Sequence, residues 1–403
     1  MLTSLALIFL VGLSAAFICR IIRLPRIIGM LVTGIVLGPY VLDFLDPTIL
    51  GISSELRQMA LIIILIKAGL SLNISDLKKV GRPALLMSFL PAIFEIAAFV
   101  LLAPVLLDVT LLEAAVMGAV LGAVSPAVVV PRMVALMEEG YGTDKQVPHL
   151  ILAGASLDDV FVIVLFSTFV GMAQGGSAKV MDFVNIPVSI ILGILAGAVL
   201  GFVLSLLFEF AHKKGTSIRQ SLKTILVLGS AFLLMSVEAL LEGIVSVSGL
   251  LAVMSMACVI QIRCRKEVSA DLAAKYGRIW LAAEVILFVL VGAAVDIRYT
   301  LQAGGMAVLM ILIALVFRSI GVLVCLIGTK LNRKEKLYCV IAYLPKATVQ
   351  AAIGSVPLSL GLPCGNIVLS VAVLSILITA PLGAAGMDLS YKKLLNSARQ
   401  SPV

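Results

Sequence analysis

The sequence predicts an all-α polytopic membrane protein, and three observations support this fold class. Hydrophobic residues make up 61% of the 403-residue chain, charged residues only 13%, and the mean hydropathy is +1.18. A soluble domain has about 45–50% apolar and roughly 25% charged residues, so this chain needs lipid to cover its apolar surface. The apolar residues fall into about thirteen stretches near the length of a membrane helix.

The predicted spans follow one another with short connections. They cover residues 2–19, 27–42, 56–72, 83–107, 111–137, 148–173, 184–210, 219–241, 244–262, 278–296, 303–329, 335–361 and 365–387. The first span ends in basic residues rather than at a small-residue cleavage site, so we interpret it as a retained helix. The longest basic connection, from Arg263 to Gly277, is expected to lie outside the membrane as a short mixed-charge segment.

Basic residues alternate between successive connections and so predict the orientation. Of the 30 Lys and Arg residues, 24 are assigned to one side of the membrane, three to the other side (Arg57, Lys179 and Arg298), and three lie deeper inside spans. By the positive-inside rule the N-terminus lies outside and the C-terminus in the cytoplasm. This placement accounts for the net charge of +8, so nucleic acid is not expected as a partner.

A few charged residues lie inside the predicted spans. Those farthest from the span ends, or of most interest for function, are Lys67, Glu95, Asp158, Asp159, Glu284, Arg318 and Lys346. A charge at mid-bilayer costs about 2.5–3.5 kcal/mol on insertion scales, so such residues are candidates for function. Lys67 and Glu284 are near span ends, where snorkelling or packing explains them equally well.

The most informative of these charges are the adjacent acids Asp158 and Asp159 in the sixth span. On a helix they point about 100° apart, so one can face a cavity while the other faces a partner. Crowded carboxylates in a low dielectric can hold a proton or a small cation, but not easily both. That competition is the physical basis of antiport, and the alternative is a pair of acids neutralised by bases for structure alone.

Glu95, Arg318 and Lys346 are the predicted buried charge partners. Glu95 and Arg318 can form a buried ion pair, with either a structural or a modulating role, and arginine does not lose its proton in a protein. Lys346 can titrate on burial or act as counter-charge to Asp158.

Prolines predict two interrupted helices. Pro126 and Pro131 lie in the fifth span, next to Ser125, and Pro345 and Pro357 lie in the twelfth, near Thr348. Proline removes a helical hydrogen bond, which gives either a simple kink or an unwound segment beside a cavity. Interrupted spans in corresponding halves indicate an inverted-repeat transporter with its site where they cross. Ser125, Thr348, Asp159 and carbonyls around residues 127–129 are candidate oxygen ligands for Na⁺ or Li⁺.

These motifs resemble the monovalent cation/proton antiporter superfamily, and within it the NHA branch of sodium/proton exchangers. The matching residues are Gly118–Arg132 (GAVLGAVSPAVVVPR), Gly140–Gly142, Ser156–Asp159 and Leu344–Val356 (LPKATVQAAIGSV). The resemblance in hydropathy covers nearly the whole chain. The NHA branch is similar to this chain in having arginine at the position of Arg318, where many relatives with an Asp-Asp pair have lysine.

The resemblance implies an NhaA-like antiporter fold, with inverted repeats and two crossed, interrupted helices, assembled as a homodimer. It implies a dimerisation domain (residues 1–76 and 218–297), a linker helix (184–210), an ion-translocation core (77–175 and 303–390) and a cytoplasmic tail (391–403). The core is expected to move like an elevator while the dimerisation domain stays fixed. Asp159 is the implied main ligand for cation and proton, with Asp158 as its neighbour.

The predicted function is therefore exchange of Na⁺ or Li⁺ for H⁺ across the cell (inner) membrane, with lipid as the surroundings and no cofactor. The stoichiometry is open between one and two H⁺ per Na⁺. Alternatives are a K⁺/H⁺ antiporter, a cation channel, or a sodium-coupled organic-anion symporter, which would need more polar lining than Thr348 and Gln350. An enzyme is not expected, because an intramembrane aspartyl protease needs its two acids on different helices.

Overall fold

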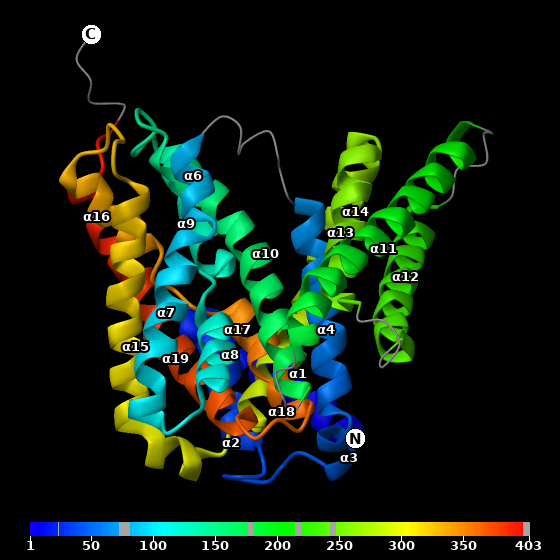
Figure 1. The fold of residues 1–403 in the computed structure, drawn as a ribbon, viewed down its shortest axis with the longest axis horizontal. Helices are drawn as coiled ribbons and strands as arrows, with labels where there is room; N and C mark the ends of the chain where they lie inside the picture. Colours follow the sequence, from blue (N-terminus) through cyan, green and yellow to red (C-terminus); the bar gives the residue numbers. More distant parts are fainter. Residues whose placement is uncertain (23, 72–80, 176–179, 214–218, 242–246, 398–403) are drawn as a thin grey trace. The chain divides into compact units, whose positions relative to one another are not determined.

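The computed structural model is mainly helical over the residues it describes, which are 1–22, 24–71, 81–175, 180–213, 219–241 and 247–397. Each predicted span falls on one helix or on consecutive helices (Figure 1). The predicted boundary between residues 76 and 77 and the last residues of the tail lie outside this part of the chain. So do Lys78, Lys79 and Lys179, which belong to the connections used to predict the orientation.

Contacts within the chain divide it into two compact units. Unit 1 comprises Met1–Ser54, Asn73–Phe169 and Leu287–Val403, and unit 2 comprises Glu55–Leu72 and Val170–Ile286. These units reflect contacts inside one subunit, so the division into a dimerisation domain and a core stays a prediction.

Unit 2 contains the end of α10, nearly all of α4 and most of α14, with three complete helices between them. The bounds are α4 (Ser53–Ser71), α11 (Val180–Lys213), α12 (Gln220–Leu241), α13 (Gly249–Arg263) and α14 (Lys266–Ala293). Helix α11 packs along α13, and α12 also contacts α13. The Ser255 hydroxyl donates to the carbonyl of Ile194 over 2.8 Å, which joins α13 to α11.

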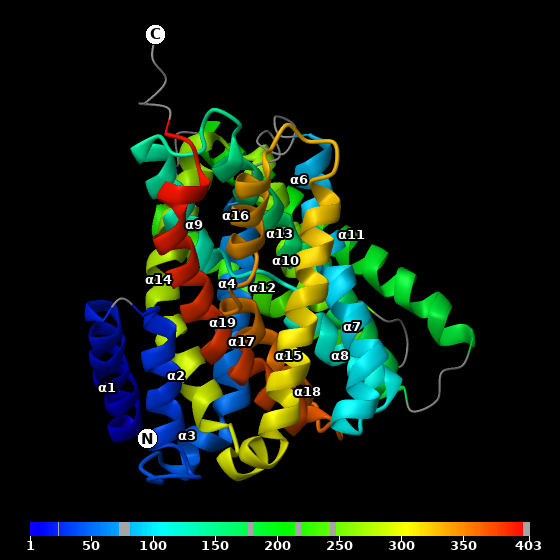
Figure 2. The same cartoon turned by 90° about the vertical axis from the view of Figure 1, so that its left-hand side faces the viewer.

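Unit 1 contains the remaining helices. They are α1 (Leu2–Ile21), α2 (Arg26–Leu37), α3 (Pro47–Gly51), α6 (Arg82–Met87), α7 (Leu90–Leu107), α8 (Leu111–Leu121), α9 (Pro126–Glu139), α10 (Val147–Gln174), α15 (Ile297–Cys325), α16 (Arg333–Ala342), α17 (Thr348–Gly354), α18 (Val356–Ser359) and α19 (Gly365–Leu394). Helices α7 and α15 pack side by side, as do α7 and α8 (Figure 2).

Helices α8 and α16 begin at the same kind of cap. Thr110 and Glu113 bond reciprocally at the start of α8, and Asn332 and Glu335 do so at the start of α16. Such a capping box satisfies two backbone N–H groups that have no partner within the helix. Both helices therefore start at a residue that the sequence defines, and both lead into an interruption.

Several helix ends differ from the predicted spans, and two of these differences have a clear local cause. Helix α14 begins at Lys266, so the segment predicted as a connection from Arg263 to Gly277 is mostly helix. Its Ala, Lys and Glu residues favour helix, and Asp271 pairs with Lys275 over 3.0 Å at the supportive i,i+4 spacing. Helix α2 ends before the predicted residue 42, because Gly38 followed by proline stops it.

The predicted all-α membrane fold is confirmed, while the number of thirteen spans stays a prediction. In the described part of the chain, 8 helical stretches are long and apolar enough to cross a membrane, and shorter apolar helices accompany them. The long ones are Leu2–Ile21, Arg82–Leu107, Leu111–Glu139, Ile191–Ala211, Gln220–Glu238, Lys266–Ala293, Gly304–Cys325 and Gly365–Leu394.

Candidate ion-binding site

The two interrupted helices meet at their breaks inside unit 1. Residues 122–125 separate α8 from α9, and residues 343–347 separate α16 from α17. The backbone N–H of Ser125 in the first break donates to the carbonyl of Pro345 in the second over 2.8 Å. Helix α17 also contacts α8 directly (Figure 1). The two breaks therefore meet, as predicted from the prolines, and a backbone hydrogen bond joins them directly.

The four prolines take different places in these segments. Pro126 opens α9, where its missing N–H has no cost, and Pro345 lies within the second break. Pro131 lies inside α9, which continues through it, and Pro357 lies in the first turn of α18. The expected free carbonyls at residues 127–129 consequently belong to a helix, and that of Val128 accepts a hydrogen bond from the Arg132 side chain.

Four buried charged side chains form a single cluster around the breaks. Arg318 of α15 lies 2.8 Å from Glu95 of α7 and 3.1 Å from Asp158 of α10. The Lys346 ammonium lies 2.6 Å from the same Glu95 carboxylate. None of the four side chains is more than 1% exposed. Two acids and two bases balance one another, which is how buried charges are tolerated.

Lys346 forms its ion pair with Glu95 and also interacts with Asp158, its predicted counter-charge. Its side chain hydrogen-bonds to Glu95 and to the carbonyl of Leu121, and it attracts the Asp158 carboxylate without a direct hydrogen bond. The direct partner of Asp158 is Arg318. The sequence could not assign the partner of Lys346 or of Asp158, because more than one buried charge of opposite sign was available to each.

The approach of Arg318 to Glu95 depends on a glycine one turn further along α15. A Cβ atom at Gly321 would lie 2.9 Å from the Cα atom of Pro91 in the first turn of α7. This distance is shorter than ordinary Cβ contacts, so only glycine lets α15 pack this closely on α7. Figure 2 shows the two helices side by side.

Three consecutive carbonyls at the end of α8 are capped by side chains from the second half of the chain. The pairs are Leu121 with Lys346, Gly122 with Arg318 and Ala123 with Gln350. The last carbonyls of a helix have no partner within it, and water is scarce at this depth. The charge cluster thus also satisfies the broken backbone.

Asp158 and Asp159 have different surroundings. Asp158 Oδ2 accepts hydrogen bonds from the Val124 N–H over 2.7 Å and from Arg318 over 3.1 Å. Asp159 is 8% exposed and makes no ion pair with a described base. Arg318 therefore fixes one carboxylate and leaves the other without a base.

Three buried oxygens near the first break have no hydrogen-bond partner among the described residues. They are Asp158 Oδ1, Asp159 Oδ1 and Ser125 Oγ. Buried polar atoms almost always have a partner, so such oxygens indicate a place for an ion or water. Oxygen atoms are the ligands that hard cations prefer. Thr348, also considered as a ligand, is the buried first residue of α17.

Sequence reasoning missed the contributions of Gln350 and Tyr343. Gln350 bridges the two breaks, and the Tyr343 carbonyl accepts a hydrogen bond from Arg318 Nε over 2.6 Å. The signal for Gln350 was present, since broken helices at membrane depth require uncharged donors and acceptors. The role of Tyr343 rests on its backbone and had no such signal.

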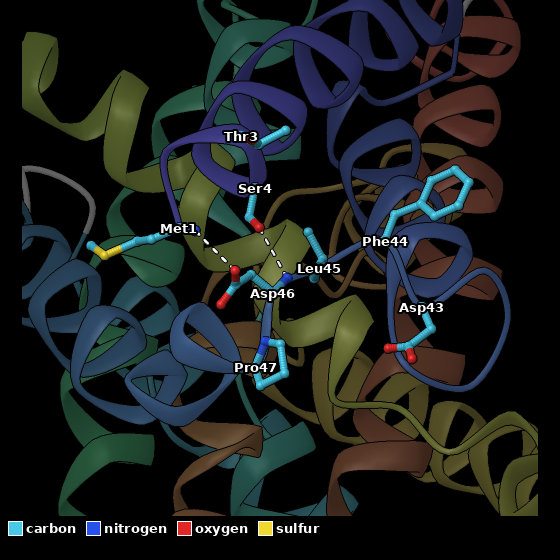
Figure 3. A pocket seen from close by; sticks show the side chains of 8 residues that line it. All are labelled: Met1, Thr3, Ser4, Asp43, Phe44, Leu45, Asp46 and Pro47. Atoms are coloured by element: carbon cyan, nitrogen blue, oxygen red, sulfur yellow. Dashed lines mark hydrogen bonds and ion pairs between the residues drawn. The ribbon is translucent and has the colours of Figure 1, made fainter.

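A separate pocket of about 260 Å³ lies at the start of α1, with none of the predicted site residues in its lining. Figure 3 shows the Met1 amine and the Ser4 hydroxyl both directed at Asp46. Hydrogen bonds from the Thr48 hydroxyl and backbone, with the Met1 amine, lower the pKa of Asp46 to about 2. This carboxylate is already satisfied by its neighbours.

The broken, crossing helices and the buried carboxylates define a membrane transporter of the cation/proton antiporter class. The chain belongs to the sodium/hydrogen exchanger family, whose transmembrane model matches residues 5–386. The predicted superfamily is therefore confirmed.

Similar proteins include sodium/hydrogen exchangers of animals. Sodium/hydrogen exchanger 9B2 of Homo sapiens is 36% identical over 387 residues, which cover 92% of this chain and 70% of that protein. Sodium/hydrogen exchanger 9B1 of Homo sapiens is 30% identical over 409 residues, covering 97% and 78%. The sodium proton antiporter MjNhaP1 from Methanocaldococcus jannaschii shares the fold, with a TM-score of 0.82 at 22% identity over 98% of both chains.

Proposed function

We propose that this protein exchanges Na⁺ or Li⁺ for H⁺, with cation and proton competing for the Asp158–Asp159 site and Asp159 as the exchanging group. The observation that carries this proposal is the contrast between the two acids. Asp158 is bound by Arg318 and Val124, whereas Asp159 forms no ion pair with a described base and has a buried oxygen without a partner among the described residues. An ionised carboxylate is costly to bury without a counter-charge, so Asp159 favours binding either a cation or a proton.

The charge balance supports exchange of one cation for one proton. Glu95 and Asp158 are balanced by Arg318 and Lys346, and Asp159 adds one further negative charge. A single Na⁺ or a single H⁺ at Asp159 brings the site to neutrality in either case. The loaded site therefore has the same charge in both directions, and transport is electroneutral.

The ligand set for the cation consists of oxygens near the first break. Asp159 and Ser125 each offer a buried oxygen without a hydrogen-bond partner in the described residues, and Asp158 offers its second oxygen. Thr348 is the candidate from the second break, where it begins α17. Carboxylate and hydroxyl oxygens favour Na⁺ and Li⁺.

Transport by an elevator-type movement of the core completes the proposal. All four residues of the charge cluster lie within the proposed core, as expected for a site carried across the membrane as one body. The proposed core is residues 77–175 and 303–390, joined by the linker helix 184–210 to a dimerisation domain that forms a homodimer. We place the protein in the cell membrane, surrounded by lipid, with the N-terminus outside and the tail 391–403 in the cytoplasm.

The test is cation-dependent proton flux in proteoliposomes with an acidic interior and a clamped membrane potential. Na⁺, Li⁺ and K⁺ are added separately, and internal pH is followed. Proton efflux driven by Na⁺ or Li⁺ supports the proposal. Efflux driven by K⁺ alone, or no efflux with any cation, would overturn it.

A further inference from the structure

Gln350 connects the two broken helices through both ends of its carboxamide. The side chain is fully buried. Its Nε2 donates to the carbonyl of Ala123 in the first break over 2.8 Å, and its Oε1 accepts from the N–H of Ala347 in the second break over 2.8 Å. The donor end therefore serves one break and the acceptor end serves the other.

The Ala123 carbonyl belongs to the same peptide group as the N–H that binds Asp158. That peptide group joins Ala123 to Val124, and the Val124 N–H donates to Asp158 Oδ2 over 2.7 Å. Because a peptide group is planar and rigid, rotating it would break both bonds together. By fixing the orientation of this peptide group, the hydrogen bond from Gln350 also fixes the N–H that binds Asp158.

The neighbouring backbone groups are held by other means. Lys346 and Arg318 cap the two preceding carbonyls, and the Ser125 N–H bonds to Pro345. Only Gln350 donates a hydrogen bond to Ala123 among the described contacts. Loss of this one neutral side chain would therefore leave the Ala123 carbonyl without a hydrogen bond and free the Ala123–Val124 peptide to rotate.

The chemistry of a carboxamide fits this position better than a charged side chain. A lysine here would add a third positive charge to a cluster that is balanced with two. An ionised carboxylate could not donate to the Ala123 carbonyl. A carboxamide both donates and accepts without changing the charge of the site.

We propose that Gln350 is a positioning residue for ion exchange, which holds Asp158 through the Ala123–Val124 peptide and so sets the geometry of the cation site beside it. This inference rests on the proposed exchange at Asp159. Ion sites need their ligands held within roughly 0.5 Å. Release of the peptide would displace Asp158 and, next to Val124, the hydroxyl of Ser125.

The test compares Gln350→Met, which keeps the size of the side chain without its hydrogen bonds, with Ser375→Ala as a matched control. Ser375 is buried in α19 and donates to the carbonyl of Ala372 within its own helix, so the control loses a buried hydrogen bond that does not involve a residue of either break. Exchange is measured in proteoliposomes over a range of Na⁺ and Li⁺ concentrations. Gln350→Asn, which keeps the carboxamide on a shorter side chain, serves as second variant if the Met variant does not fold.

We expect the apparent KM for Na⁺ to rise about tenfold in Gln350→Met, equivalent to about 1.4 kcal/mol. The maximal rate stays within about twofold, and the ratio of the Na⁺ and Li⁺ KM values changes. In Gln350→Asn the KM changes in the same direction by less, and in Ser375→Ala it does not change. Unchanged KM values in the Gln350 variants, or an equal rise in Ser375→Ala, would overturn the inference.

A second readout is independent of transport. Amide hydrogen exchange of the full chain in nanodiscs reports on the Val124 and Ser125 N–H groups, and we expect exchange about tenfold faster in Gln350→Met than in Ser375→Ala. Unchanged protection would refute the role of Gln350 even if Asp159 carries the ion. Conversely, Gln350→Met could show faster amide exchange while Asp159→Asn still transports normally. This result would support the contact between Gln350 and the peptide but reject the proposed function.

Discussion

Arg318 lies 3.1 Å from Asp158 and forms a fully buried ion pair with it, in which Nη2 donates to Oδ2. The next residue, Asp159, makes no such pair with a described base. Two carboxylates that are neighbours in the sequence therefore have different electrostatic surroundings. Asp158 belongs to the balanced charge cluster with Glu95 and Lys346, while Asp159 forms no ion pair with a described base.

Replacement of Arg318 by alanine should mainly destabilise the fold. Its guanidinium pairs with Glu95 and Asp158 and caps the carbonyls of Gly122 and Tyr343. Removing one partner from a buried ion pair costs about 3–5 kcal/mol. Thermal unfolding in detergent should show this loss, with a smaller one for Arg318→Lys, which keeps the charge but lacks the planar fork. Full stability of Arg318→Ala would contradict the structural role of the cluster.

Gly154→Ala should strain the packing of α10, and Tyr343→Phe should relieve part of that strain. A Cβ atom at Gly154 would overlap the hydroxyl of Tyr343 and lie 2.9 Å from Cβ of Met87. Overpacking of this kind costs about 1–3 kcal/mol. The Tyr343 hydroxyl has no hydrogen-bond partner among the described residues, so Tyr343→Phe alone should be nearly neutral. A double variant no more stable than Gly154→Ala would show that the hydroxyl is not the obstacle.

Exchange should be insensitive to the membrane potential. The balanced cluster leaves one negative charge at Asp159, which one Na⁺ or one H⁺ neutralises. Initial rates of Na⁺ uptake into proteoliposomes should therefore be equal across a series of K⁺ diffusion potentials set with valinomycin. Rates that rise or fall steadily with the potential would indicate two H⁺ per Na⁺ instead.

Glu335 should contribute more to stability than the corresponding residue of the other capping box. Its fully buried carboxylate accepts hydrogen bonds from Lys145 over 3.0 Å and from the Asn332 N–H over 2.7 Å. Glu335→Ala removes the cap and leaves Lys145 without this partner, which costs about 1–3 kcal/mol. Glu113→Ala, in the exposed box at the start of α8, is the matched control. Equal losses in unfolding temperature would contradict this assignment.

Much of this architecture could be predicted because lipid leaves few alternatives. Apolar stretches of span length must be helical, and prolines at Pro126 and Pro345 mark places where a helix cannot continue. The pairing of Glu95 with Arg318 followed from the cost of burying either residue alone. Arginine at position 318 also argued against a proton carrier there, and the structure gives it four hydrogen-bonded partners.

What could not be predicted depends on three-dimensional proximity. The sequence did not indicate that Lys346 would contact Glu95, because both acids were plausible partners for an ammonium. Pro131 illustrates a second limit, since α9 continues through it and only the break before Pro126 interrupts the helix. The start of α14 at Lys266 was not predicted, because charged residues between apolar spans indicate a connection, although Lys, Glu and Ala favour helix in water as well.

The most direct test of the account is coupled Na⁺ and H⁺ flux in proteoliposomes containing Asp159→Asn, a variant that keeps the shape of the side chain and removes its charge. Its unfolding temperature is measured alongside to establish that the protein is folded. The account predicts that a folded Asp159→Asn protein shows no exchange above protein-free liposomes, while the wild type exchanges Na⁺ for H⁺. Full exchange by the folded variant would contradict the central claim that Asp159 binds the transported ion.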